Sequence, residues 1–279
     1  MDTIELRNLQ NTADDIREMT IKAIAHLGVG HIGGSLSVVD ILALLYNKEM
    51  HVDPQNPSKE GRDLLVLSKG HSGPALYATL ALKGFFPISW LDTLNQGGTK
   101  LPSHCDRTKT PGIDMSTGSL GQGLSVACGM AYASRLDGWG NHVYAIIGDG
   151  ESDEGQNWEA AMFASEYHLG NLIAFTDYNK LQLDGPTKEI MDLGDIQGKW
   201  RAFGWYTDRV DGHDLAAMDE AITTAKKNQG EKPAMIILDT IKGKGAPCAE
   251  GLVTNHNMNI SPEQAEEAIR AIEAGRKNR

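Results

Sequence analysis

The hydrophobic residues of the chain follow two different periodicities, which predict helices and strands. Between residues 12 and 27, Ile16, Met19, Ala23 and Ile24 lie three or four positions apart with charged residues between them. This pattern is typical of an amphipathic helix, which we expect to end at Gly28. Short apolar runs bounded by turn residues predict buried strands at 64–67, 143–147, 172–176 and 234–238. Further helices are expected near 38–48, 74–83, 121–136, 155–168, 214–228 and 262–275.

Predicted strands and helices alternate along the chain. This order favours an α/β protein with a parallel sheet covered by helices on both faces. In such folds ligands bind where loops leave the carboxyl ends of the strands. The sequence contains no internal repeat, low-complexity tract or Pro/Ser-rich linker. We therefore expect residues 1–279 to form a single domain.

The composition of the chain excludes several classes of protein and of binding partner. Hydrophobic residues make up 41% and charged residues 23%, which excludes disordered and fibrous proteins. Asp and Glu number 37 against 26 Lys and Arg, and this excess of negative charge argues against a nucleic-acid partner. Neither an apolar run long enough to span a membrane nor a signal-peptide pattern is present, so we expect no membrane association and a cytoplasmic location. The three cysteines lack a CxxC pair and are expected to be buried free thiols.

The glycine-rich segment 28–33 carries a candidate functional histidine. It has the GxGxxG spelling, but a helix rather than a strand precedes it, so we reject a dinucleotide-binding site. His31 lies between glycines, where missing side chains let a ligand approach the backbone closely. We therefore treat His31 as a candidate site residue.

The strongest local signal for a ligand is a carboxylate placed directly after a buried strand. Asp149 follows the run 143–147 between two glycines, and Asn179 follows the next predicted strand. Because the carboxyl ends of parallel strands meet at one sheet edge, the two side chains are expected to converge. One carboxylate and one amide oxygen suit Mg²⁺, which completes its shell with water and substrate phosphates. The pattern therefore predicts a phosphate-bearing ligand.

An aspartate in a GDG turn, followed at a distance by an asparagine after the next strand, resembles the diphosphate–Mg²⁺ motif of thiamine-diphosphate enzymes. Further segments, in order along nearly the whole chain, resemble one branch of them, the transketolases. The match covers only the amino-terminal, diphosphate-binding region of full transketolases. The chain thus resembles the amino-terminal subunit of a split transketolase. The matching segments are Gly30–Ser37, Leu67–His71, Pro102–His104, Ser116–Gly123, Gly148–Gly150 with Glu154–Gly155, Tyr178–Lys180 with Asp184–Gly185, and Thr240–Gly245.

The resemblance implies thiamine diphosphate and Mg²⁺, or Ca²⁺ or Mn²⁺ in its place, as cofactors. The metal ligands implied are the side chains of Asp149 and Asn179 and the main-chain oxygen of Leu181. His71 and Gly150 match positions that contact the diphosphate. The other implied cofactor-binding residues are Gly118 and Leu120 against the aminopyrimidine, together with Glu154, Ile241 and His256.

Three histidines are implied to be catalytic. His31 and His104 match histidines that face the hydroxyl groups of the donor sugar and assist proton transfers. His256 matches a histidine near both the diphosphate and the substrate. For this role we expect pKa values near the working pH.

The resemblance also implies a partner chain. Glu154 matches a position linked across a subunit interface to the glutamate that activates the aminopyrimidine. That glutamate belongs to the pyrimidine-binding region, expected on a carboxy-terminal subunit with two copies of each chain. The implied function is transfer of a two-carbon ketol unit from a ketose or its phosphate to an aldose. The alternatives are the amino-terminal part of a 1-deoxyxylulose-phosphate synthase, a 2-oxoacid dehydrogenase alpha chain, or a silent cofactor-binding scaffold.

Two positions depart from the family pattern. Many members have Pro after the first histidine and in the TGPLG turn, where this chain has Ile32 and Ser119. Because Pro restricts φ and removes an N–H donor, these loops are expected to differ in shape. The departures bear on substrate preference and leave the cofactor class unchanged.

Overall fold

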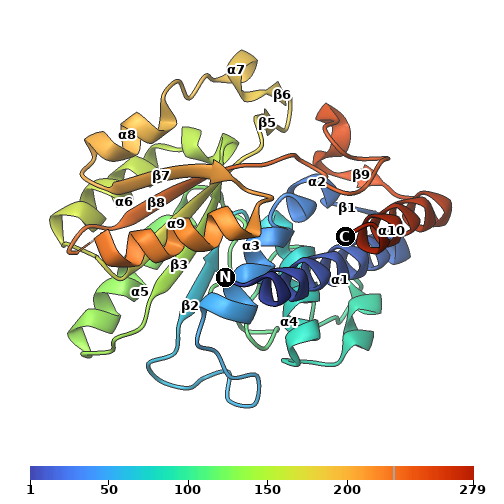
Figure 1. The fold of residues 1–279 in the computed structure, drawn as a ribbon, viewed down its shortest axis with the longest axis horizontal. Coiled ribbons are helices and arrows are strands. Elements are labelled where there is room, and N and C mark those ends of the chain that lie inside the picture. The colour runs from blue at the N-terminus through green and yellow to red at the C-terminus, as the bar shows by residue number, and fades with distance from the viewer. Residues whose placement is uncertain (229) are drawn as a thin grey trace.

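A five-stranded parallel sheet forms the centre of the computed structural model, which describes residues 1–228 and 230–279 (Figure 1). The strand order is β2-β3-β4-β8-β7, and every neighbouring pair is parallel. The α/β fold class expected from the sequence is thus confirmed. The strands are β2 Leu64–Leu67, β3 Val143–Gly148, β4 Leu172–Tyr178, β7 Tyr206–Asp211 and β8 Ala234–Asp239.

Helices cover both faces of the sheet (Figure 1). Two small antiparallel pairs, β1 Val29–Gly30 with β9 Met258–Asn259 and β5 Leu181–Gln182 with β6 Gly185–Pro186, lie outside it. The helices are α1 Thr3–Leu27, α2 Ile32–Leu36, α3 Val39–Leu44, α4 Gly73–Lys83, α5 Gln122–Leu136, α6 Gly155–Glu166, α7 Thr187–Ile190, α8 Ile196–Ala202, α9 Leu215–Asn228 and α10 Pro262–Lys277. Shorter helical segments lie at Leu45–Glu49, Gly70–Ser72, Ile88–Thr93, Gly150–Asp153 and Val253–His256.

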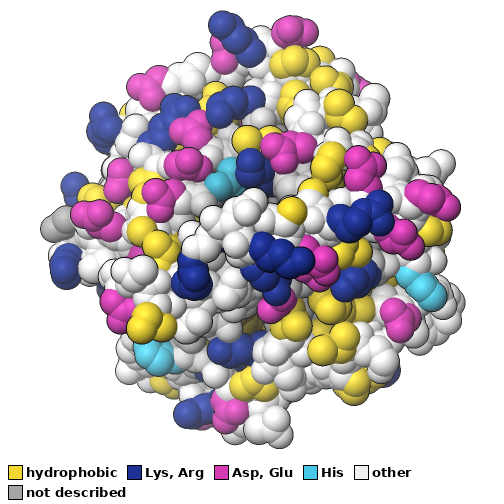
Figure 2. All heavy atoms as spheres, turned by 45° about the vertical axis from the view of Figure 1, so that its right-hand side comes forward, with side chains coloured by type: hydrophobic (Ala, Val, Ile, Leu, Met, Phe, Trp, Pro, Cys, Tyr) yellow, Lys and Arg dark blue, Asp and Glu magenta, His cyan; other side chains and the backbone are white. Residues whose placement is uncertain are grey.

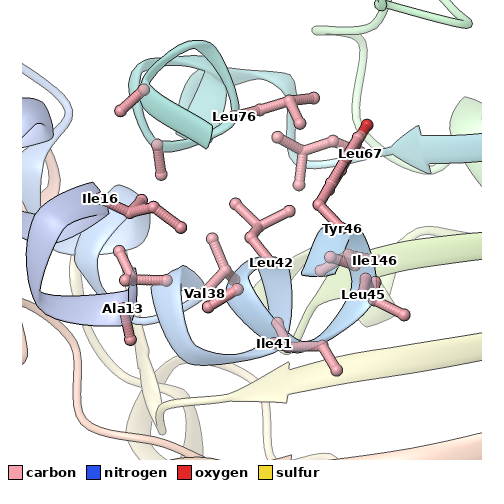
Figure 3. Packing of buried hydrophobic residues seen from close by; sticks show 14 of the residues in the cluster. Ala13, Ile16, Val38, Ile41, Leu42, Leu45, Tyr46, Leu67, Leu76 and Ile146 are labelled. Atoms are coloured by element: carbon pink, nitrogen blue, oxygen red, sulfur yellow. The ribbon is translucent and has the colours of Figure 1, made fainter. Parts of the chain in front are cut away.

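The central strands are buried on both faces, which explains their continuous apolar sequence. Tyr144 and Ile146 of β3 point into the core that α1, α3, α4 and α9 share, whereas Ala145 and Ile147 point into the core under α5, α6 and α8. Figure 3 shows Ile146 beside Leu45 and Tyr46 in the first of these cores. The alternation follows from the two-residue period of a strand. It holds the carboxyl end of β3 in a fixed position.

Helix α1 is longer than its predicted range of 12–27. It begins at Thr3 because the Asp2 carboxylate accepts hydrogen bonds from the N–H groups of Ile4 and Glu5 and so caps the first turn. It ends before Gly28, whose φ of 89° lies in the left-handed region. The predicted end is therefore confirmed, and the predicted start is wrong.

Strand β7 was not expected from the sequence. Tyr206–Asp211 has a largely polar sequence, which suits an edge strand whose side chains are partly buried or exposed. The four apolar runs all form strands, and β2 has the predicted bounds. Periodicity therefore identified the buried strands and missed the edge strand.

The surface charges and the cysteines give little information about the function. Acidic and basic side chains are interspersed on the face that Figure 2 shows. Within the described residues, no helix is both long and apolar enough to cross a membrane. Cys105 and Cys128 are buried and Cys248 is half-buried, all three as free thiols. The cytoplasmic location remains a prediction.

Candidate active site

A cavity of about 300 Å³, here called the central cavity, lies at the carboxyl ends of β3 and β4. This is where ligands of parallel sheets bind. It is lined by the predicted site residues His71, Leu120, Asp149, Gly150, Glu154, Asn179, Leu181 and His256. Its remaining lining residues are Gly34, Lys69, Gly148, Glu151, Asp153, Gln182, Leu183 and Lys242.

Asp149 is a buried carboxylate at the end of β3, and only 2% of it is exposed. It accepts hydrogen bonds from the backbone N–H groups of Gly150, at 2.8 Å, and Lys180. Burial, and after it the charge of Asp177, raise the pKa of Asp149 to about 7. Among the described residues Asp149 has no ion-pair partner. When it is ionised, the Asp149 carboxylate is therefore not neutralised by an ion pair with any side chain that the structure describes.

The chain turns sharply after β4 between the two other predicted metal ligands. Lys180 has a φ of 69°, an uncommon value for a residue with a side chain, and its N–H points at Asp149. Asn179 holds its Oδ1 atom 3.1 Å from the N–H of Leu181. The carbonyl oxygen of Leu181 accepts a hydrogen bond of 3.3 Å from Lys242 Nζ.

These groups fit a hard divalent cation. Carboxylate, amide and carbonyl oxygens are the ligands that Mg²⁺ and Ca²⁺ prefer. In the part of the chain that the structure describes, no three His, Cys, Asp or Glu side chains group as a metal site. A cation in the central cavity would therefore depend on these mixed oxygen donors and on the phosphates of its ligand.

Two lysines in the central cavity were not among the predicted site residues. Lys69 is 2% exposed and forms an ion pair with the fully buried Asp177. Burial opposes the charge of Asp177, but Lys69 and hydrogen bonds from Ser37 and Thr240 hold its pKa below the ordinary value. Burial, and after it the charge of Lys69, lower the pKa of Lys242 to about 8. The two ammonium groups thus lie among the carboxylates of the cavity lining, where they can donate hydrogen bonds to phosphate oxygens.

Four histidines from distant segments meet at one edge of the central cavity. The ring centroid of His31 lies 5.5 Å from those of His71 and His104 and 5.3 Å from that of His256. His71 and His256 are 4.8 Å apart. His31 and His104 do not line the cavity themselves, but His31 links His104 to the two lining histidines. The structure thus brings together all three residues predicted to be catalytic.

The pKa values of these histidines differ from the sequence expectation. Burial, and after it the neighbouring His104, lower the pKa of His31 to about 4. Burial and then Lys242 lower that of His256 to about 4, and burial also lowers the values of His71 and His104. The expectation of values near the working pH is therefore wrong for this structure. At neutral pH the cluster consists of uncharged imidazoles, which can both donate and accept hydrogen bonds.

The depressed pKa of His31 predicts a measurable pH dependence. Its NMR titration midpoint should lie near pH 4, whereas a free histidine titrates near pH 6.5. Between these values the unfolded chain binds a proton at this position and the folded chain does not. Relative to a His31→Asn variant, the wild type should therefore lose stability as the pH falls from 6.5 to 4. Because one proton is involved, this loss is at most ~1.4 kcal/mol per pH unit. A midpoint near pH 6.5 would contradict the prediction.

Two further predicted residues lie outside the lining of the central cavity. Gly118 has a φ of 151°, and a Cβ atom there would lie 3.2 Å from Cδ2 of His104, so the glycine lets the two loops approach closely. Ile241 is 39% exposed, and its N–H donates to Nε2 of His213. The structure therefore places Gly118 at the histidine cluster and Ile241 next to the lining residue Lys242.

Comparison with known proteins identifies the family. Residues 8–273 match the family model "Transketolase, thiamine diphosphate binding domain". The chain is 58% identical to the 6-deoxy-6-sulfo-D-fructose transketolase subunit SqwG of Clostridium sp. (strain MSTE9), over 95% of this chain and 96% of that relative. The chain belongs to the transketolase family. It is also 39% identical to an apulose-4-phosphate transketolase subunit of Phocaeicola vulgatus, over 98% of this chain and 94% of that relative.

Transketolases of known structure share the fold. The chain superposes on the transketolase from Leishmania mexicana with a TM-score of 0.88 and 30% identity, over 96% of this chain and 41% of that one. Relatives named as subunits are matched along nearly their full length. This chain is therefore the amino-terminal, thiamine-diphosphate-binding subunit of a split transketolase, an enzyme that transfers ketol groups.

Sequence reasoning on this transketolase chain missed a buried carboxylate, Glu151. It is 3% exposed and accepts hydrogen bonds from the N–H groups of Gly121 and Gly148, both at 2.9 Å, and from the Ser68 hydroxyl. It thus ties the turn that carries Asp149 to the loop before α5. The predicted residue Glu154 precedes α6 and lines the cavity. Only burial in three dimensions distinguishes the two glutamates.

Proposed function

We propose that this chain, as a single domain, binds thiamine diphosphate and a divalent metal in the central cavity, the metal being Mg²⁺ with Ca²⁺ or Mn²⁺ as substitutes. Asp149, Asn179 and the carbonyl oxygen of Leu181 would hold the metal. His71, Gly150 and the two lysines would hold the diphosphate. The support is the buried carboxylate of Asp149, which forms no ion pair among the described residues, in the same cavity as the ammonium groups of Lys69 and Lys242.

We propose 6-deoxy-6-sulfo-D-fructose as the donor sugar. The observation that carries this proposal is the 58% identity to the subunit named for that substrate, against 39% to the apulose-4-phosphate subunit. The chemistry is that of the family, since this ketose carries its sulfonate at the end remote from the bond that is broken. Transfer of carbons 1 and 2 to an acceptor aldose leaves a four-carbon aldose that keeps the sulfonate.

Donor competition tests this proposal. The chain and its partner would be assayed together with 6-deoxy-6-sulfo-D-fructose, fructose 6-phosphate and apulose 4-phosphate under identical conditions. We expect kcat/KM for the sulfonated donor to be higher by about tenfold or more, the size of one or two well-placed polar contacts. Equal or greater kcat/KM for either phosphorylated donor would refute the donor assignment and leave the cofactor assignment intact.

The chain's own contribution to the reaction is the histidine cluster. Bound thiamine diphosphate supplies the electron sink for breaking and forming the C–C bond. His31, His104 and His256 would bind and orient the donor hydroxyl groups and move protons to and from them. Their lowered pKa values keep the imidazoles uncharged at neutral pH, so each ring presents one N–H donor and one acceptor nitrogen to the hydroxyl groups. Partial burial of the cluster also limits access of water to these transfers.

Substitution of the substrate-side histidines should affect turnover more than cofactor binding. His31→Ala and His104→Ala are each expected to lower kcat by roughly 10²-fold, the usual contribution of a general acid or base. The affinity for thiamine diphosphate should change much less, because neither residue lines the central cavity. Steady-state assays and calorimetry on the complex measure the two effects separately. Full activity in both variants would show that the histidines are structural.

We further propose that the carboxy-terminal subunit covers the open side of the central cavity, in a complex with two copies of each chain. Leu120 and Leu183 line the cavity, yet they are 38% and 61% exposed. Met162 and Phe163 of α6 and Tyr167 just after it are also exposed. Exposed apolar side chains of this kind mark protein interfaces. The support for the partner is that related chains are named as subunits.

A further inference from the structure

Three side chains outside the central cavity form a charged relay. Arg17 of α1 donates a hydrogen bond of 2.9 Å from Nη2 to Oδ2 of Asp40 in α3. The same oxygen lies 2.8 Å from Nδ1 of His213, which follows β7. Arg17 and Asp40 are 6% and 7% exposed, and the His213 side chain is 14% exposed. The relay thus joins three distant segments through side chains that are mostly buried.

The relay holds a short loop at both ends. His213 Nε2 accepts a hydrogen bond of 2.9 Å from the N–H of Ile241. Arg17 Nε donates a hydrogen bond of 3.0 Å to the carbonyl oxygen of Lys244. Residues Ile241–Lys244, here called the Lys242 loop, therefore lie between two anchors of one relay. Between those anchors Lys242 extends into the central cavity and reaches the carbonyl oxygen of Leu181.

The hydrogen bonds determine the proton positions on His213. Since Nε2 accepts from a backbone N–H, the ring proton must sit on Nδ1, which donates it to Asp40. Arg17 keeps Asp40 charged and oriented for this bond, because its guanidinium contacts the same oxygen. A ring without an acceptor at Nε2 would leave the N–H of Ile241 without its partner.

The Lys242 loop has little freedom to adapt to such a loss. Gly243 has a φ of 82°, and its N–H donates to the carbonyl oxygen of Gly33 at 2.9 Å. A Cβ atom at Gly243 would lie only 2.6 Å from the carbonyl oxygen of Ala249. Movement of the loop at Ile241 would therefore displace Lys242 in the central cavity.

We propose that His213, oriented by Asp40 and Arg17, is a positioning residue that aims Lys242 at the diphosphate of the cofactor. The inference rests on the proposed function, which places the diphosphate in the central cavity. His213 does not line that cavity and acts only through the Lys242 loop. We therefore expect that a change in the relay, two of whose members lie on α1 and α3, changes the affinity for the cofactor.

The test measures thiamine diphosphate affinity and turnover in the assembled complex. His213→Phe keeps an aromatic ring of similar size and removes both hydrogen bonds. We expect it to weaken cofactor binding by about tenfold, the loss of one positioned contact to a charged group. At saturating cofactor, kcat should remain close to that of the wild type. His213→Gln, which can still present an acceptor to Ile241, should recover part of the affinity. His142→Phe, the same substitution at a half-buried histidine before β3, should leave the affinity unchanged.

A double-mutant cycle with Lys242→Met shows whether His213 acts through Lys242. If it does, His213→Phe should have little further effect on affinity in the Lys242→Met background. An equal loss in both backgrounds, or unchanged affinity in His213→Phe, would overturn the inference. Unchanged affinity in Lys242→Met alone would instead refute the proposed place of the diphosphate. Should His213→Phe fail to assemble, His213→Gln carries a weaker form of the same expectation, a partial loss of affinity that disappears in the Lys242→Met background.

Discussion

The purified chain alone should catalyse no detectable ketol transfer, and addition of its carboxy-terminal subunit should restore it. The resemblance assigns the glutamate that activates the aminopyrimidine to the partner, and the structure leaves apolar residues exposed beside the central cavity. A cofactor held between two chains needs an interface that excludes water, and permanent interfaces commonly bury roughly 2,000 Å² or more. The measurement is a ketol-transfer assay combined with light scattering.

The composition of the active species completes this test. With the partner present, light scattering should show a heterotetramer with two copies of each chain. Alone, the chain should self-associate or be unstable, since its apolar interface would face water. Robust transfer by a monomer of this chain would refute the split-enzyme assignment. An active complex of another stoichiometry would refute only the two-by-two assembly.

Asp149→Ala should abolish metal-dependent binding of thiamine diphosphate by the assembled enzyme. Asp149 is the single carboxylate among the proposed metal ligands, and its replacement leaves a doubly charged cation with amide and carbonyl oxygens alone. We expect an affinity loss of roughly 10²-fold or more, at the upper end of the range for weakened metal sites. Calorimetric titration with thiamine diphosphate and Mg²⁺ measures the loss directly.

The stability of the apo protein separates this effect from misfolding. Asp149→Asn keeps the shape of the side chain and removes a buried charge that burial disfavours, as its raised pKa shows. Asn loses one of the two oxygens that accept from the N–H groups of Gly150 and Lys180, and this loss offsets the removal of the buried charge. The thermal unfolding midpoint without ligands should therefore stay close to that of the wild type. Asp153→Asn, at a partly buried carboxylate in the same cavity, is the matched control and should keep most of the affinity. Unchanged affinity in both Asp149 variants would refute the metal assignment.

Four of the five strands of the sheet could be predicted from the sequence, because buried strands must be apolar on both faces. The runs at 64–67, 143–147, 172–176 and 234–238 all became strands for this reason. The sequence also determined where Asp149 and Asn179 lie, since parallel strands bring their carboxyl ends to one edge. The edge strand β7 escaped detection, because a strand with partly exposed side chains needs no continuous apolar run. Nor does the helical pattern of 12–27 reveal that the cap at Asp2 starts the helix at Thr3.

The electrostatics of the site depend on contacts between residues that are far apart in the sequence. The sequence shows histidines at positions 31, 71, 104 and 256, but their pKa values depend on burial and on one another, and these follow from packing. The ion pair of Lys69 with Asp177 and the relay from Arg17 to His213 join residues far apart in the chain. Local sequence patterns do not predict such long-range contacts. Motif spacing therefore determined which chemistry the chain supports, and three-dimensional proximity decided the charge state of each group and which residues hold it in place.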